Sequence, residues 1–264
     1  DSMILFTADW HIKLGQKNVP VKWALDRYKS FFEKIYSLEE DCGMHIIGGD
    51  LFDRLPNMEE LELYFSFIRR VGIPTVIEAF DTSKPLFTHV RGEIPPHVKP
   101  EVDLDRFSEF PVVFAGDLHA HSNTQKNIVY PGSPMTTSFH RNEVSTGYIL
   151  INEGSWNWLW EPFNLPQLLR KTVRSPEEMI PTEFHHTIYE IEGDIQKLAS
   201  VENSELLDKK VIKRNTETAL VISKEMTIEE ELVEYLTYIL EIPEKQTHDI
   251  LSTYNDYSQK VAME

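Results

Sequence analysis

Hydrophobic and polar positions follow two kinds of pattern in the first part of the chain. Short apolar runs at residues 3–9, 45–50 and 75–77 predict buried strands. The segments 22–40 and 57–71 between them carry apolar residues at helical spacing. Strands and helices are therefore expected to alternate up to about residue 77.

The pattern changes in the middle of the chain. Short apolar runs at residues 86–89, 112–116, 128–130 and 148–151 follow one another without long helical stretches between them. A change from alternating strands and helices to consecutive strands favours two sheets packed face to face with helices on the outside. The sequence therefore predicts a layered α/β fold.

The last hundred residues differ again. Four prolines between residues 162 and 181 predict an irregular connector. Residues 187–222 are typical of a small strand–helix–strand module, and residues 227–240 and 247–257 of two amphipathic helices. We expect three parts: a large domain over residues 1–161, a small α+β module over residues 162–222 and a helical segment over residues 223–264.

Potential metal ligands stand just past the ends of the predicted strands. They are Asp9, His11, Asp50, His89, His119 and His121. Side chains two residues apart in an extended segment leave the same face, so each pair with that spacing can direct two ligands to one point. Carboxylates and imidazoles together suit borderline divalent ions such as manganese or zinc. Each motif alone is compatible with chance or a turn, but their joint occurrence favours a metal site.

The order of these motifs resembles that of the calcineurin-like metallophosphoesterases. It comprises Asp-x-His, Gly-Asp-x-x-Asp-Arg, a later single His and Gly-Asp-x-His-x-His. Residues 87–90, 116–121 and 130–134 are similar to the SbcD-type nuclease subunits of recombination and repair exonucleases, and the C-terminal tail is similar to the tailed-phage versions. The resemblance is good over residues 3–160 and is limited to general organisation beyond them.

This resemblance implies a four-layer α/β/β/α sandwich with a small capping module that helps to hold DNA. It implies a DNA exonuclease or endonuclease of recombination, repair and replication that uses two Mn²⁺ ions, with Mg²⁺ or another divalent metal as the alternative. One ion would be held by Asp9, His11, Asp50 and His121. The second would be held by Asp50, His89 and His119. Asp53 and Arg54 would orient these ligands without binding the ions.

One motif of that family is missing. It is Gly-Asn-His-Asp/Glu, which supplies an Asn ligand and a His near the scissile phosphate. The predicted strand at residues 75–77 should lead into it, yet the segment that begins at Lys84 follows only seven residues later. The stretch missing between about residues 77 and 81 was either deleted or is absent only from this sequence. The exposed sheet edges that a deletion would leave favour the second explanation. The catalytic residues are therefore unassigned.

The charge of the chain bears on its partners. The formal net charge is −17, and DNA binding depends on neutralising phosphates, so weak intrinsic affinity for DNA is expected. In the resembling family an SMC-like ATPase adds DNA-binding surface, and we expect it to bind the C-terminal helices. Residues 22–40 and 57–71 are rich in aromatic side chains, which indicates either a core or a homodimer interface.

Composition places further limits on the protein. The single cysteine, Cys42, excludes an internal disulfide and favours a reducing compartment. No apolar stretch approaches the roughly eighteen residues of a membrane span. We therefore expect a cytoplasmic protein, in the host cytoplasm if a phage encodes it.

Two other functions remain open at this stage. A different phosphoesterase of the same fold, acting on nucleotides or phosphoproteins, would share the metal ligands. A non-catalytic scaffold is favoured only if the stretch after Ile77 is truly deleted. The basic clusters at residues 170–174 and 209–214 favour the DNA nuclease.

Overall fold

The computed structural model describes most of the chain. The described residues are 2–67 and 81–212, together with Leu232, Val233, Leu236, Gln246, Thr247 and 249–254. The predicted break near Ile77, the predicted strand at 75–77 and most of the two predicted C-terminal helices lie outside these residues.

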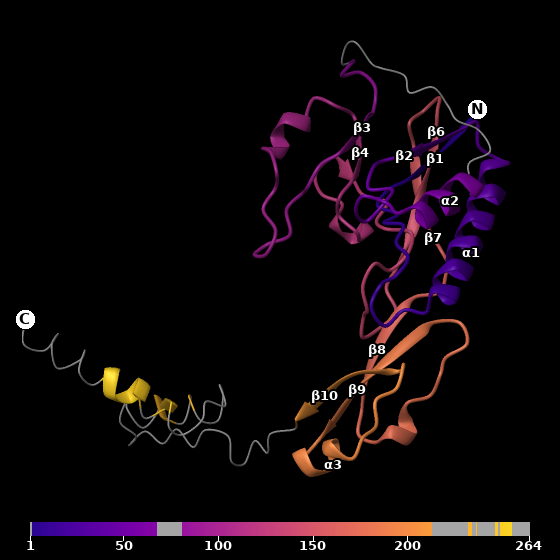
Figure 1. The fold of residues 1–264 in the computed structure, drawn as a ribbon. Coiled ribbons are helices and arrows are strands. Elements are labelled where there is room, and N and C mark those ends of the chain that lie inside the picture. The colour runs from indigo at the N-terminus through magenta and orange to yellow at the C-terminus, as the bar shows by residue number, and fades with distance from the viewer. Residues whose placement is uncertain are drawn as a thin grey trace, which may run out of the picture. The chain divides into compact units, whose positions relative to one another are not determined.

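Four strands of the large unit form a mixed sheet (Figure 1). Their order is β2 (Met44–Ile47), β1 (Met3–Thr7), β6 (Gly147–Asn152) and β7 (Trp158–Pro162). β1 runs parallel to β2 and antiparallel to β6. Leu5 on one face of this sheet belongs to the same core as the aromatic side chains of α1 (Val21–Glu39) and α2 (Met58–Phe67). The two predicted helices therefore cover one face of the sheet.

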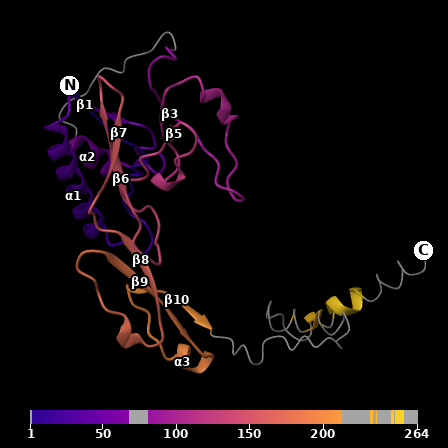
Figure 2. The same ribbon diagram turned by 180° about the vertical axis from the view of Figure 1, so that it is seen from behind.

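A second sheet covers the opposite face of the first (Figure 1, Figure 2). Its strands are β3 (Leu86–His89), β4 (Val113–Gly116) and β5 (Ile128–Val129), all parallel. Phe6 of β1, Phe114 of β4 and Ile149 of β6 share one buried cluster, so the two sheets pack face to face. The first three layers are therefore the helices, the first sheet and the second sheet, in the order that the sequence predicted.

The outer face of the second sheet is covered differently from our expectation of a helical fourth layer. Val113 and Ala115 of β4 pack against Val90 and against Leu104 of the 3₁₀ turn η1 (Leu104–Phe107). Within the described residues this face is therefore covered by an irregular segment with one short turn rather than by a long helix.

A third sheet has the order β10 (Leu207–Ile212), β9 (His186–Gly193) and β8 (Leu168–Val173), with β8 parallel to β9. The sequence prediction of an irregular connector over residues 162–181 was wrong in its middle part. Its prolines lie outside β8, where they limit the strand without breaking it; Pro176 instead begins the 3₁₀ turn η3 (Pro176–Glu178). The predicted helix after β9 is short, because α3 (Ile195–Ala199) ends well before β10.

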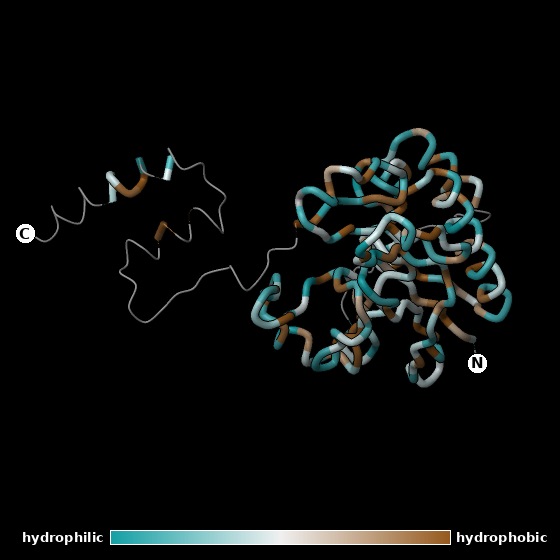
Figure 3. The backbone as a smooth tube through the Cα atoms, turned by 90° about the horizontal axis from the view of Figure 1, so that it is seen from below, coloured by the Kyte–Doolittle hydropathy of each residue, from teal (hydrophilic) through white to brown (hydrophobic). Residues whose placement is uncertain are grey.

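The chain divides into two compact units by its contacts. One comprises Asp1–Ile191 and Glu202–Lys209, and the other Glu192–Val201 and Lys210–Glu264. These units do not follow the predicted boundary after residue 161, and the three-part division stays a prediction. Hydrophilic residues alternate with hydrophobic ones along the described part of the backbone (Figure 3). No helix within the described ranges has both the length and the apolar character needed to cross a membrane.

Candidate metal centre

The loops that follow β1, β2 and β4 carry strained backbone conformations. Seven non-glycine residues of the described chain have positive φ, and four of them lie in these loops: Asp9 (55°), His11 (47°), Asp50 (45°) and Asp117 (107°). Such conformations are unfavourable for residues with a Cβ and persist only where the surroundings hold them. The strain is therefore concentrated where the predicted metal ligands stand.

Backbone hydrogen bonds hold the loops after β1 and β2 together. The amide of Asp9 donates to the carbonyl oxygen of Gly49 at 3.1 Å, and the amide of His11 donates to that of Asp50 at 2.9 Å. The two loops thus extend the pairing of the parallel strands β1 and β2 beyond their ends. This fixes the side chains of three predicted ligands relative to one another.

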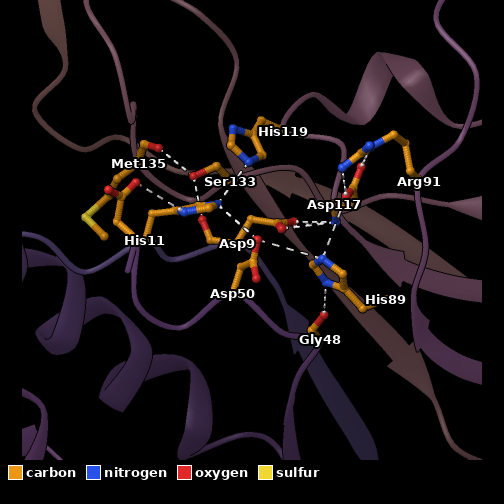
Figure 4. A network of polar contacts seen from close by, with 11 residues as sticks. Asp9, His11, Gly48, Asp50, His89, Arg91, Asp117, His119, Ser133 and Met135 are labelled. Carbon is orange, nitrogen blue, oxygen red and sulfur yellow. Dashed lines mark hydrogen bonds and ion pairs between the residues drawn. The ribbon is translucent and has the colours of Figure 1, made fainter. Parts of the chain in front are cut away.

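A first group of possible ligands consists of Asp9, His11 and His119, with one ligand atom of each lying within 4.8 Å of the others. The Nε2 atoms of His11 and His119 are 3.0 Å apart, so both imidazoles point to the same place (Figure 4). Burial lowers the pKa of both histidines, which keeps their rings neutral at neutral pH. Burial also raises the pKa of Asp9 to about 7. A cation would relieve the cost of ionising this buried carboxyl group.

A second group consists of Asp9, Asp50 and His89, which meet the same distance criterion. Nδ1 of His89 donates to the carbonyl oxygen of Gly48 at 2.9 Å. This leaves Nε2 as the free ligand atom, 3.8 Å from Oδ2 of Asp50. Asp9 belongs to both groups, so the two possible ion positions are neighbours.

Asp117 lies beside the second group, although it was not among the predicted ligands. Its Oδ1 is 3.9 Å from Nε2 of His89, and its backbone amide donates to both carboxylate oxygens of Asp9 at 3.0 and 3.1 Å. Asp117 and His119 are two residues apart. Asp117 stands just past the end of β4 in the same Gly-Asp-x-His-x-His motif, which is the signal that could have identified it.

His121 is in neither of these two groups. Its Nδ1 donates to the carbonyl oxygen of Tyr130 at 2.6 Å, and its ring stacks on Trp160 with a centroid distance of 5.0 Å and an interplanar angle of 9°. The 3₁₀ turn η2 (His121–Asn123) begins at this residue, so the extended conformation that the spacing argument requires has already ended. No metal-compatible group found in the described chain contains His121.

Asp53 supports His11 from the side. Its Oδ1 is 3.6 Å from Nδ1 of His11, and its Oδ2 accepts a hydrogen bond from Nζ of Lys13 at 2.7 Å. Nδ1 of His11 is buried and makes no hydrogen bond in the described structure. Asp53 thus lies beside the ring edge opposite to Nε2, which faces His119.

Glu60 connects the segment after β1 with the segment after β2, and the sequence analysis did not identify it. Its side chain is fully buried and accepts hydrogen bonds from the amide of Leu14 at 2.8 Å and from both terminal nitrogens of Arg54 at 2.8 and 3.1 Å. It also accepts from the amide of Asn57 at the start of α2. Burial alone would raise the pKa of Glu60, but these donors lower it. In sequence it looked like one of several solvated acidic residues.

A turn over residues 130–133 joins the first group to the second sheet. The hydroxyl of Ser133 donates to the carbonyl oxygen of Asp9 at 2.7 Å, and its amide donates to that of His119 at 3.0 Å. Gly132 has a φ of 80°, and a Cβ there would lie 2.9 Å from the carbonyl oxygen of His119. Only glycine suits this close approach, which holds Asp9 and His119 at a fixed separation.

The donor set fits divalent metal ions. It combines carboxylates, one of them buried, with neutral imidazoles whose free nitrogens converge. The other ring nitrogen of His89 is hydrogen-bonded to a carbonyl oxygen, as is usual for metal-binding histidines. Both groups therefore have the chemistry of a metal site.

Comparisons with known proteins agree with a nuclease interpretation. No protein-family model matches the chain. A curated relative, named "Probable exonuclease subunit 1" of Escherichia phage T5, is 36% identical over 280 residues, covering 82% of this chain and 86% of its own length. Since 82% of 264 residues is about 216, part of the relative within the alignment has no counterpart in this chain.

Proposed function

The chain belongs to the family of the phage T5 probable exonuclease subunit 1, and on this premise we propose that it is the metal-dependent nuclease subunit of a phage exonuclease. The observation that carries the proposal is the pair of ligand groups that share Asp9. Two neighbouring divalent ions are a common device for hydrolysing phosphodiesters. The proposed roles are DNA end processing in recombination, repair and replication.

The geometry favours a revised ligand assignment. We assign one ion to Asp9, His11, Asp50 and His119, and the other to Asp9, Asp50, His89 and the neighbouring Asp117. His119 thus takes the place that the family resemblance gave to His121, and Asp117 takes the place that it gave to His119. Mn²⁺ is the preferred ion, with Mg²⁺ or another divalent metal as the alternative.

When bound, two such ions neutralise charge on the scissile phosphate and lower the pKa of an attacking water. The residues of the chain prepare this chemistry. His11 and His119 are held neutral with their Nε2 atoms 3.0 Å apart, and the Gly48 carbonyl fixes the orientation of His89. Asp9 releases its proton when a cation takes its place. No serine or cysteine nucleophile is needed.

The relative has residues within the alignment that this chain lacks, and we propose that they include a stretch after Ile77 that is absent only from this sequence. We place that stretch between about residues 77 and 81, and propose that it carries the Asn ligand and the His of the family motif. A protein that truly lacked it would have an incomplete second ion site. The non-catalytic scaffold is the alternative in that case.

A cluster of cationic side chains offers a contact for the DNA backbone. Glu190 is buried, with 4% of its side chain exposed, and pairs with Arg141 at 3.0 Å, Lys209 at 3.0 Å and Arg170 at 3.7 Å. The side chains of Arg141 and Lys209 are 64% and 56% exposed, so each can also bind a phosphate. The buried carboxylate of Glu190 thus holds three cationic side chains close together on a protein that is acidic overall.

This cluster is small for a chain of net charge −17, so we propose that a partner supplies much of the DNA-binding surface. The relative is named as a subunit, which supports an assembly. The proposed partner is an SMC-like ATPase that binds the helical segment 223–264. Co-purification of the full chain and of a chain truncated at Thr227 with this ATPase tests the assignment, and equal retention of both would remove the segment from the interface.

We also propose a homodimer through the helices predicted at residues 22–40 and 57–71. Phe31, Phe32 and Phe67 are buried within the core of one chain, so they are not available to a partner. Met58 and Phe65 of α2 are 69% and 64% exposed and are the better candidates. Sedimentation of the wild-type chain and of Phe65→Ser tests this interface, with a monomeric variant as the expected result.

The nuclease assignment is tested with the full chain and Mn²⁺ on three substrates, namely linear duplex DNA, closed circular duplex DNA and a small phosphodiester. We expect degradation of the linear duplex and little activity on the small phosphodiester. Cleavage of the small phosphodiester alone would favour another phosphodiesterase of the same fold. Inactivity on all three, with the ATPase present, would favour the scaffold.

A further inference from the structure

Arg91 stands at the rim of the second ligand group, where its guanidinium group contacts Asp117. Its backbone is fixed, because its carbonyl oxygen accepts a hydrogen bond from the amide of Glu101 and the preceding Val90 amide donates to Gly116. Its side chain is 54% exposed. It lies two residues after His89, so a partly exposed cation stands at the edge of the proposed active site, beside Asp117 (Figure 4).

The contact that Arg91 makes is loose. Its Nε is 3.3 Å from Oδ2 of Asp117, and its Nη2 is 3.5 Å from Oδ1. These distances are at or beyond the long end for a charge-assisted hydrogen bond, which is typically about 2.7–2.9 Å. Lys13 makes a useful comparison, because its Nζ is 2.7 Å from Asp53 and its side chain is only 33% exposed. Lys13 is engaged in a short ion pair, whereas Arg91 is held weakly.

The carboxylate that holds Arg91 has a second possible partner. Asp117 lies 3.9 Å from Nε2 of His89, on the side of the second ligand group, and it is only 15% exposed. A divalent ion bound there would draw electron density from the Asp117 carboxylate and weaken its attraction for Arg91. The guanidinium keeps its charge at every accessible pH, and its planar donors match two oxygens of a phosphate.

We propose that Arg91 is a substrate-binding residue that contacts a backbone phosphate of DNA beside the second ligand group. Its pairing with Asp117 is the resting arrangement, and occupation of the second group by a divalent ion releases it toward the substrate. This inference rests on the proposed nuclease function and names a residue that contacts the substrate of that same site.

A purely positioning role for Arg91 gives different consequences. If Arg91 served only to orient Asp117, its removal would weaken metal binding and leave the salt dependence of DNA binding unchanged. If it contacts phosphate, its removal leaves metal binding equal or tighter, because a competitor for Asp117 is gone. The salt dependence then changes as well, since each lost phosphate contact reduces the slope of log K against log salt by about 0.9 for duplex DNA.

The experiment compares the full wild-type chain with Arg91→Ala, Arg91→Lys and the control Arg106→Ala. Arg106 is an exposed arginine of η1, so its loss removes the same charge outside the ligand groups. Anisotropy of a labelled phosphorothioate duplex that resists cleavage is measured over a range of salt concentrations, with and without Mn²⁺. Calorimetric titration with Mn²⁺ alone follows the ligand groups, and melting temperatures confirm that each variant folds.

With Mn²⁺, we expect Arg91→Ala to bind the duplex on the order of tenfold more weakly, with the reduced salt slope, while Arg106→Ala behaves as wild type. Without Mn²⁺ the two alanine variants should differ little, because Arg91 is then paired with Asp117. Arg91→Lys should keep the salt slope and lose part of the affinity, since it keeps the charge but not the fork of donors.

The outcomes distinguish a failure of the inference about Arg91 from a failure of the proposed nuclease function. If the wild-type chain cleaves linear duplex DNA but Arg91→Ala and Arg106→Ala bind it equally, the inference about Arg91 is wrong and the nuclease assignment stands. Weaker Mn²⁺ binding by Arg91→Ala with an unchanged salt slope would assign it the positioning role instead. If the wild-type chain neither binds nor cleaves duplex DNA even with the ATPase present, the proposed function itself is contradicted.

Discussion

The two ligand groups share Asp9 but are built differently. In the first group the His11 side chain is only 13% exposed, and the turn at Ser133 joins Asp9 to His119 by hydrogen bonds. In the second group Asp50 and His89 are 49% and 33% exposed, and the neighbouring Asp117 is engaged by a solvent-exposed arginine. The comparison indicates that the first position is preformed by the fold, whereas the second is open to substrate.

Replacing His119 gives the largest expected effect and tests the first group directly. His119→Ala removes one of two converging imidazoles, and its Mn²⁺-dependent cleavage of DNA should fall by more than about a hundredfold with the fold intact. His121→Ala is the matched control, because His121 stacks on Trp160 outside both groups. It should keep most of the activity and lose thermal stability. Loss of cleavage in His121→Ala alone would restore the original assignment.

Glu60 tests whether both groups depend on one support. Glu60→Ala leaves Arg54 and the amide of Leu14 without their buried partner, so the free energy of unfolding should fall by about 3 kcal/mol. Glu59→Ala removes the exposed neighbouring carboxylate and should change stability by less than about 0.5 kcal/mol. Urea denaturation measures both. Equal stability of the two variants would contradict the role of Glu60 in joining the loops.

Much of this site could be predicted from the sequence, and the exceptions have physical causes. Five of the six candidate ligands lie together, because each stands at the end of a strand and the ends of the parallel pairs β1 and β2, and β3 and β4, meet at the same edge of their sheets. His121 does not, because the chain turns at that residue and its ring meets Trp160, a contact that no local pattern contains. Asp117 was missed because it follows glycine at a strand end, where Asp is also common in turns.

The fold too was predicted correctly where local sequence patterns decide it, and was missed where contacts between distant segments decide it. Predicted helix 22–40 agrees with α1 to within one residue at each end, because its apolar periodicity is strong. β8 was missed, because its prolines dominate the local composition although they lie beyond the strand. Glu60 was missed, because its acidic neighbours suggest a solvated helix face while its partners come from other segments.

The difference between the groups also predicts unequal metal affinity. We expect calorimetric titration of the full chain with Mn²⁺ to show a tighter and a weaker phase, assigned to the first and second group. Asp117→Asn should weaken only the second phase, by about tenfold, because the amide keeps the shape and loses the charge. An equal effect on both phases would contradict the separation of the two groups.

A smaller expected effect is the release of the Asp9 proton when Mn²⁺ binds. The pKa of Asp9 is raised to about 7 by burial, so the carboxyl group of the chelator-treated chain is mostly protonated at pH 6 and mostly ionised at pH 8. Mn²⁺ binding should therefore release close to one proton from Asp9 at pH 6 and almost none at pH 8. Titrations in buffers with different heats of ionisation measure the number. Equal release at both pH values would contradict the buried state of Asp9.

The same raised pKa gives a stability prediction of known sign. The folded chain binds the Asp9 proton more tightly than the unfolded chain, whose value is about 3.8. The contribution of Asp9 to stability is therefore fully present below that pH and is lost as the pH rises through about 7. In chelator the melting temperature should fall across this window, and saturating Mn²⁺ should reverse the fall. A pH-independent difference between the two conditions would argue against Asp9 as a ligand.

The most direct test of the account is the anomalous difference map of a Mn²⁺-soaked crystal of this protein. The account predicts two peaks close together, the stronger one among Asp9, His11 and His119 and the weaker one among Asp9, Asp50 and His89, beside Asp117. A single peak bound by His121, or no peak at the ends of β1 and β4, would contradict it.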